Sequence, residues 1–221
     1  LYQPYISDIM ISNSYDEMLK NLRETLEELF NKINKKEAYK TGKNALVFRI
    51  MEEVLKRFLI SEKLKVINGD QIKILALEYE FSKNIFIKEL DKKIKFKGAV
   101  DRIDIYNDTL RFVDYKTGNI SESDLTFSNW EELRIYPKKN PLFQVMLYAY
   151  LLKNEFHYDK IIAGVIPLKT FKNNFLAVSQ KENKQKRKNL KIEGEVFPNF
   201  EKELFKLIYE IFDPSIPFTE K

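Results

Sequence analysis

The sequence predicts an α/β protein in which a mixed β-sheet packs between helices. Two N-terminal segments place apolar residues at helical spacing, and a long central stretch is rich in β-branched and aromatic residues. Further helix and strand signals follow, an order that is typical of a sheet covered by helices. We expect residues 1–221 to form a single domain, because a chain of this length fits one domain and shows no internal repeat.

The first two elements are predicted to be helices. Apolar side chains recur at helical spacing in residues 15–33, and Ser14 followed by Glu17 has the pattern of a capping box. A second apolar stripe predicts a helix over residues 44–60, and Gly42 marks the break before it.

The period then changes to that of strands. The turn signal Asn68-Gly69-Asp70 precedes a region dominated by β-branched and aromatic residues. The predicted strands cover residues 72–81, 85–90, 94–106, 110–115, 161–167 and 175–178.

The remaining segments have other signatures. Residues 121–141 show no clear period and are predicted to form an irregular crossover. Residues 142–152 are apolar nearly all round, which predicts a largely buried helix. Charged residues 181–191 are predicted to be a flexible loop, and residues 198–213 a closing helix, since Pro198 suits a first turn.

The composition excludes several classes of site. The chain has no cysteine, so it can form no disulfide and hold no iron–sulfur cluster through thiolates. This suits a reducing cytoplasm, which is the location we expect. No window approaches 18 apolar residues, so we expect no contact with a membrane. The 38 basic residues exceed the 33 acidic ones by 5, which is compatible with a polyanionic partner without requiring one.

One predicted hairpin carries charges where half-buried strands should be apolar. Side chains alternate between faces, so Asp101 extends an apolar row of the first strand, and Asp114 and Lys116 extend one of the second. A loop at residues 107–108, or a longer one at 106–109, places Asp101 opposite Asp114. Opposed carboxylates repel unless they share a proton or a divalent cation. The alternative is a surface hairpin with solvated charges, and spacing alone does not decide between the two.

The chain resembles the RecB/AddB-like branch of the PD-(D/E)XK nuclease superfamily. The resemblance lies in three strings: GAVDRID at 98–104, FVDYKTG at 112–118 and QVMLYAYL at 144–151. The resemblance implies a restriction-endonuclease-like core. Within this branch, the chain is similar to the exonuclease domain at the C-terminus of Bacteroidetes-type AddB-like proteins. Such a domain hydrolyses phosphodiester bonds of DNA in repair and recombination, with Mg²⁺ or Mn²⁺ as cofactor.

The resemblance also implies roles for individual residues. By matching position, Asp101 and Asp114 hold the divalent metal, and the backbone carbonyl of Tyr115 completes the metal shell. Lys116 assists the attacking water.

The same resemblance implies a wider set of contacts. An acidic residue on an earlier strand usually joins the metal ligands; Glu78 fits best and Glu80 is its rival. Gln144 and Tyr148 match the helix motif and share one helix face, because they are four residues apart. We expect them, with Arg102, to contact the substrate; Gln144 and Tyr148 could instead support the catalytic lysine.

Two departures from the family pattern matter. Members of this branch commonly carry a metal-binding histidine near the start of the domain, whereas His157, the sole histidine, follows all three strings. We therefore expect the chain to be a fragment of a longer protein that lacks an N-terminal portion. AddB-type nucleases often hold an iron–sulfur cluster, and the absence of cysteine excludes it here.

Two functions are compatible with these observations. The first is a metal-dependent DNA exonuclease domain whose partners are DNA and a helicase domain or subunit. The alternative is a catalytically silent module that binds DNA or a partner on the same fold. The intact set of Asp101, Asp114 and Lys116 favours the enzyme.

Overall fold

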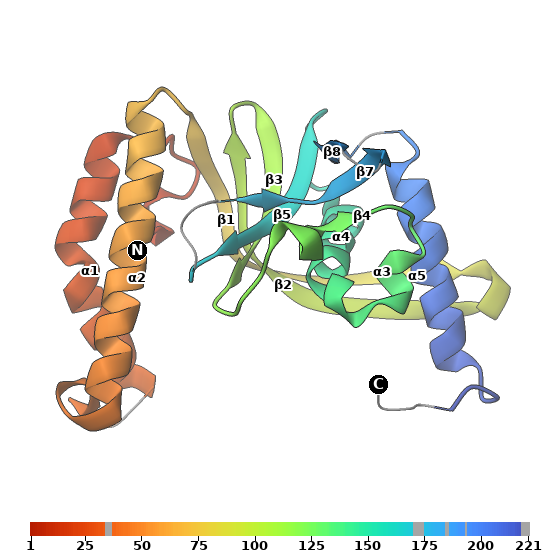
Figure 1. The fold of residues 1–221 in the computed structure, drawn as a ribbon, viewed down its shortest axis with the longest axis horizontal. Helices are drawn as coiled ribbons and strands as arrows, with labels where there is room; N and C mark the ends of the chain where they lie inside the picture. Colours follow the sequence, from red (N-terminus) through yellow and green to blue (C-terminus); the bar gives the residue numbers. More distant parts are fainter. Residues whose placement is uncertain (34–36, 170–174, 184–185, 193, 218–221) are drawn as a thin grey trace.

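The computed structural model describes residues 1–33, 37–169, 175–183, 186–192 and 194–217 (Figure 1). The helices are α1 (Ser12–Ile33), α2 (Gly42–Ile67), α3 (Glu132–Ile135), α4 (Asn140–Leu152) and α5 (Val196–Phe212). The strands are β1 (Ile72–Ile87), β2 (Lys92–Tyr106), β3 (Thr109–Lys116), β4 (Thr126–Phe127), β5 (Ile161–Pro167), β6 (Leu176–Ala177), β7 (Ser179–Asn183) and β8 (Lys186–Asn189). No helix among these residues is both long and apolar enough to cross a membrane.

A mixed sheet forms the centre of the described residues. Its strand order is β1-β2-β3-β5-β6, and a second, smaller sheet has the order β4-β7-β8. In the large sheet β3 and β5 are parallel and the other neighbours are antiparallel. The segment that joins the parallel pair contains α4, as a parallel connection requires a long crossover. The predicted α/β class with a mixed central sheet is therefore confirmed, and the architecture is consistent with a restriction-endonuclease-like core.

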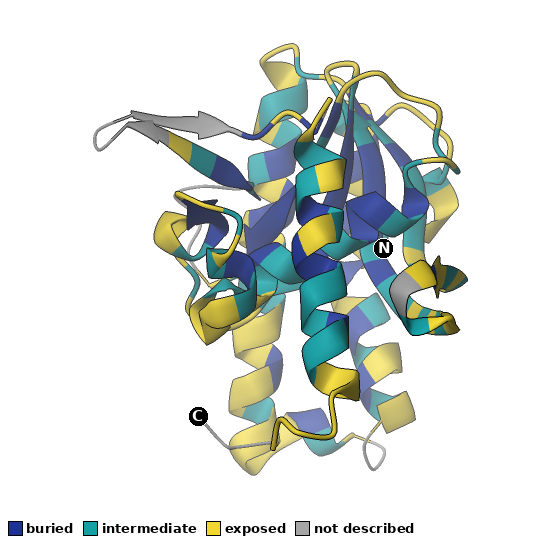
Figure 2. Ribbon diagram, turned by 90° about the vertical axis from the view of Figure 1, so that its right-hand side faces the viewer, coloured by how far each residue is buried: buried dark blue, intermediate teal, exposed yellow. Residues whose placement is uncertain are grey.

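Helices cover both faces of the large sheet (Figure 1). Phe112 of β3 belongs to the apolar core that contains α4 and α5. Its neighbour Val113 packs against Phe58 of α2 on the opposite face. The alternation of side chains along a strand explains why consecutive residues serve the two cores. Figure 2 shows the resulting pattern, with the central strands largely buried.

Several predicted boundaries are wrong. Helix α1 begins at Ser12, so Ser14 lies inside the helix and is buried rather than capping it. Helix α2 ends at Ile67, about two turns later than predicted. Strand β1 is one strand where two were expected. Within residues 181–191, predicted to be a loop, the described residues form most of β7 and all of β8, while 184–185 lie outside the described residues.

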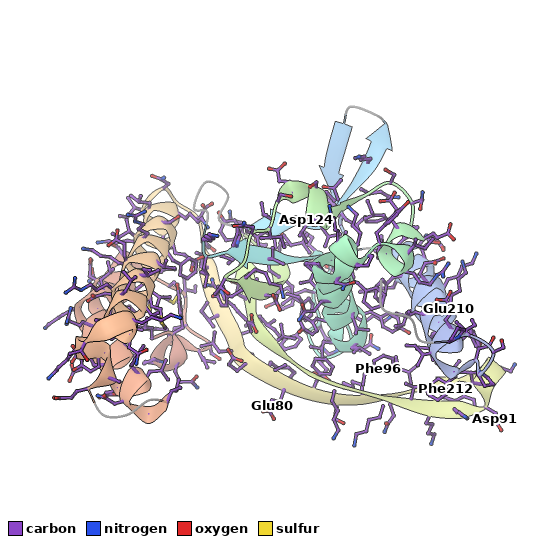
Figure 3. The ribbon with its side chains drawn as sticks, turned by 60° about the horizontal axis from the view of Figure 1, so that its bottom comes forward. Glu80, Asp91, Phe96, Asp124, Glu210 and Phe212 are labelled. Carbon is purple, nitrogen blue, oxygen red and sulfur yellow. The ribbon has the colours of Figure 1, made fainter. Side chains whose placement is uncertain are left out.

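Strands β1 and β2 continue beyond the sheet as a two-stranded ribbon. In this ribbon residues 80–87 pair with residues 92–99. The ribbon passes below α4 and ends beside α5, where the Lys92 Nζ atom lies 5.0 Å from the centre of the Phe212 ring (Figure 3). Because β2 pairs with β3 only from Arg102 onward, the two strands separate at Asp101.

Candidate active site

The charged residues of the predicted hairpin meet where β2 separates from β3. We call this place the fork and define it by Glu78, Asp101, Asp114 and Lys116. The two-residue turn that sets its register has positive φ angles of 46° at Asn107 and 62° at Asp108, as the tightest hairpins require. The predicted pairing of the apolar residues is confirmed: Ile105 with Leu110 and Ile103 with Phe112.

The backbone ladder ends one pair before Asp101 and Asp114. Its last pair is Arg102 with Val113, and the same register continued would place the two aspartates opposite each other. In a continued ladder the Tyr115 N–H would donate to β2, but here it donates to Oδ2 of Asp101 at 2.6 Å. The Asp101 carboxylate thus takes the place of a backbone acceptor where the strands part.

The Tyr115 carbonyl faces the same gap. Alternate residues of β3 direct their backbone N–H and C=O groups toward β5. Lys116 is one of them, because its carbonyl accepts a hydrogen bond of 2.9 Å from the N–H of Leu168. The N–H and C=O groups of a strand residue point to the same side, so those of Tyr115 both point toward β2. The expected role of this carbonyl in a metal shell stays a prediction.

Asp114 and Lys116 form a close ion pair inside the fork. Asp114 is 3% exposed, and its Oδ2 atom lies 2.7 Å from the Lys116 ammonium. Burial raises the pKa of Asp114 and the nearby Asp101 charge adds to this, although Lys116 opposes both. Among the described residues, this Oδ2 atom accepts no hydrogen bond of normal geometry. A buried carboxylate oxygen of this kind is suited to a cation.

Glu78 lies beside Asp101 on the third strand of the fork. The β1–β2 ladder has Leu77 opposite Arg102 and Tyr79 opposite Val100, which leaves Glu78 opposite Asp101. Burial and the Asp101 charge both raise the pKa of Glu78, so the two carboxylates are close enough to repel.

The backbone of Glu78 is left-handed, with a φ of 47°. This conformation is strained for a residue with a side chain, and such strain clusters at functional sites. Leu77 belongs to the core under α1 and α2, whereas Tyr79 belongs to the α4 core. The strand therefore changes the face it buries at Glu78. Glu78 and its rival Glu80 are both exposed. Glu80 is opposite Ala99 on the ribbon, whereas Glu78 is opposite Asp101, so position in the ladder favours Glu78.

The α4 motif contacts the fork through Lys116. The Lys116 ammonium donates to Oε1 of Gln144 at 2.8 Å, and Nε2 of Gln144 donates to the Tyr148 hydroxyl at 2.7 Å. Burial and the charges of Asp114 and Asp101 raise the pKa of Tyr148. With 8% of its surface exposed, Tyr148 offers little area to a substrate, and the geometry favours support of Lys116.

Arg102 does not reach the fork, which corrects the expectation that it binds substrate. Its side chain is fully buried on the opposite face, and Nη1 donates to Glu62 of α2 at 2.8 Å. Its Nε donates to Asp104 at 2.5 Å, and Asp104 also accepts from Nε of Arg111 at 2.7 Å. The alternation of β2 puts Arg102 and Asp104 on one face, but alternation could not show that α2 covers that face. His157 is exposed.

The fork has the right donors for a hard divalent cation. Carboxylate and carbonyl oxygens are the preferred ligands, and Mg²⁺ commonly takes one or two carboxylates together with water and substrate phosphate. The fork offers ligands of this type: the carboxylates of Asp101 and Asp114 and the carbonyl of Tyr115. As the side chains lie, no three acidic or histidine residues among the described ranges are grouped closely enough to hold an ion. Glu78 would therefore have to turn toward Asp101 to act as a third ligand.

Comparison with known proteins identifies the family of the chain. The family model described as "PD-(D/E)XK nuclease superfamily" matches residues 9–221. No curated protein matches the chain. A solved structure titled "Crystal structure of SSO0001" is 14% identical and aligns with 89% of this chain and 82% of that chain, but its TM-score of 0.30 supports no argument.

Proposed function

Since the chain belongs to the PD-(D/E)XK nuclease superfamily, we propose that it is a Mg²⁺- or Mn²⁺-dependent deoxyribonuclease whose active site is the fork. Membership in this family implies nuclease activity by metal-dependent phosphodiester hydrolysis. The single observation that carries the proposal is the Asp114–Lys116 pair, with Asp101 on the neighbouring strand and Gln144 behind the lysine.

Phosphodiester hydrolysis needs an activated water, charge neutralisation at the phosphorus and a stabilised leaving oxygen. A bound divalent cation supplies Lewis acidity and lowers the pKa of a coordinated water. Asp101, Asp114 and the Tyr115 carbonyl would hold it, with Glu78 as a further ligand. Lys116 is positioned to orient the attacking water and to stabilise negative charge in the transition state. Gln144 fixes the Lys116 ammonium through its 2.8 Å hydrogen bond.

The finer parts of the proposal rest on the motif strings. The AddB-like strings favour a DNA exonuclease that works as the nuclease domain of a longer repair or recombination protein. A helicase domain or subunit would then supply unwound DNA, and the cytoplasm is the compartment we propose. The basic excess of 5 charges suits a DNA substrate.

A degradation assay tests the proposal. Purified protein is incubated with linear single-stranded, linear double-stranded and covalently closed circular DNA, with Mg²⁺, Mn²⁺ or EDTA. Linear DNA should be degraded only with metal, and circular DNA should be spared. Lys116→Ala should lower the rate by about 10²–10³, the usual cost of removing one transition-state stabiliser.

The matched control is Lys56→Ala, which removes an exposed lysine of α2. Cutting of circular DNA would reject the exonuclease assignment alone. Metal-dependent binding of DNA without any cleavage would favour the catalytically silent binding module. Equal activity of the Lys116→Ala variant and the wild type would reject the fork as the active site.

A further inference from the structure

The outer face of the β1–β2 ribbon is a row of cations. Lys93, Lys95 and Lys97 are exposed, and they alternate with Ile94 and Phe96, which pack partly against the α4 core. Alternate residues of a strand project to the same side, so the three ammonium groups share one face at a spacing of about 6.6 Å. Figure 3 shows Phe96 on the side of the ribbon facing α5, and Glu80 on the other side.

The residues of β1 directly opposite this row carry no charge. Ser82, Asn84 and Phe86 are opposite Lys97, Lys95 and Lys93, and all three are exposed. Glu80 lies one pair further along the same face, opposite Ala99, and is the acidic residue of β1 nearest to the row in the ladder. The lysine on the inner face, Lys83, is in contrast paired with Glu155. Within the described ranges the three outer lysines make no ion pair, so their charge is directed at solvent.

The row leads toward the fork. A hollow of about 560 Å³ begins at Lys97 and is lined by Glu80, Phe81, Ser82, Lys97, Gly98 and Ala99. The Phe81 ring packs directly on the backbone of Gly98, because a Cβ atom there would lie 2.9 Å from the ring. Asp101 follows two residues after Ala99 on the same strand, so the hollow lies between the lysines and the acidic fork.

We infer that the ribbon's outer face, Lys93 to Lys97, binds one phosphate backbone of the nucleic acid that enters the fork. The inference rests on the proposed function for the identity of the substrate. A row of regularly spaced, unpaired ammonium groups complements a polyanion of regular charge spacing. Lysines contact phosphates as point charges, and phosphate contacts carry no sequence information, so the face adds affinity and direction without sequence preference.

The test measures binding separately from cleavage. Fluorescence anisotropy with labelled 30-nucleotide DNA, single- or double-stranded, is recorded in EDTA between 50 and 200 mM salt. The triple variant Lys93→Gln/Lys95→Gln/Lys97→Gln should reduce the slope of log affinity against log salt by about 2–3, because each phosphate contact contributes roughly 0.7–0.9. Over this fourfold salt range the wild type should lose roughly 15- to 60-fold more affinity than the variant.

The matched control is Lys20→Gln/Lys43→Gln/Lys56→Gln, which removes the same charge from exposed positions of α1 and α2. An equal effect of the two triple variants, or no effect of either, would overturn the inference. So would binding to anionic phospholipid vesicles without binding to DNA. If the wild type binds DNA through the ribbon but never cuts it, the inference stands and the proposed function fails. If the wild type cuts DNA and the ribbon variant binds DNA normally, the proposed function stands and the inference fails.

Discussion

Asp104→Asn tests the packing that holds the back of the fork. The side chains of Glu62, Arg102, Asp104 and Arg111 form a buried cluster in which two carboxylates balance two guanidinium groups. Asp104 is fully buried and accepts from Arg102 at 2.5 Å and from Arg111 at 2.7 and 2.8 Å. Asparagine keeps the shape of the Asp104 side chain but leaves one guanidinium charge of the cluster uncompensated. Its amide N–H₂ group would also face the N–H donors of the arginines.

The expected cost follows from this geometry. Removing one partner of a buried ion pair typically costs about 3–5 kcal/mol, because a buried charge is left unpaired. For a chain of 221 residues, each kcal/mol lowers the melting temperature by about 2–4 °C. We therefore expect Asp104→Asn to lower the melting temperature by roughly 6–20 °C at pH 7. The loss is large against a typical unfolding free energy of about 5–15 kcal/mol.

The structure also predicts how the stability difference between wild type and Asp104→Asn changes with pH. Burial raises the pKa of Asp104, but the two guanidinium groups outweigh it and hold the pKa below its ordinary value of 3.8. Stability from a carboxylate with a lowered pKa is present above its unfolded pKa and is lost as pH falls through the folded one. The difference between wild type and variant should hold from pH 8 to 5 and shrink below 3.8.

Urea denaturation at several pH values provides the measurement. The control is Asp108→Asn, an exposed position with a φ of 62° that asparagine adopts readily. The reasoning is refuted if Asp104→Asn costs less than about 1 kcal/mol, or no more than Asp108→Asn.

Three further predictions concern the fork. Asp114→Asn should raise the melting temperature in EDTA at pH 7 by a few degrees, because burial raises the pKa of Asp114 and its ionised form lowers stability as pH rises through the folded pKa; no difference from wild type at pH 7 would contradict this. Gln144→Leu should lower kcat about 10- to 100-fold with a smaller change in KM, since it removes the acceptor that fixes Lys116; a change in KM alone would indicate substrate binding instead. The Mn²⁺ affinity should begin to weaken with falling pH above the ordinary carboxylate values of 3.8 and 4.5, because protons compete with the metal for Asp114 and Glu78, whose pKa values without metal are both raised; weakening only below those values would contradict the electrostatics of the fork.

The part of the site that depends on turn length and strand alternation could be predicted from the sequence. The turn at Asn107-Asp108 admits few loop lengths, and that alone fixed which residues of β2 and β3 are opposed. Periodicity could not show that α2 would cover the face carrying Arg102, because a charged residue in a strand is typical of a solvent face. A hint lay in Glu62, a charged residue within a turn of the apolar Phe58 and Leu59.

Other features depend on contacts between distant segments. The change of buried face at Glu78 needs a positive φ in the middle of a strand, which no alternation pattern reveals. The length of the ribbon likewise follows from β1 continuing through residues 82–84, where polar side chains had predicted a break. Ile85, Ile94 and Phe96 of the ribbon pack against the α4 core, a contact between distant segments that the local pattern does not contain.

Titration calorimetry with Mn²⁺ tests the central claim that the fork is a metal site. The wild type should bind Mn²⁺, and Asp114→Asn should weaken binding about 100-fold or more, since even the outer supports of a metal ligand are worth 10- to 100-fold. The control Asp159→Asn changes an exposed aspartate that follows α4 and should bind as the wild type does. Equal Mn²⁺ affinity in the wild type and the Asp114→Asn variant, or no binding by either, would contradict the account.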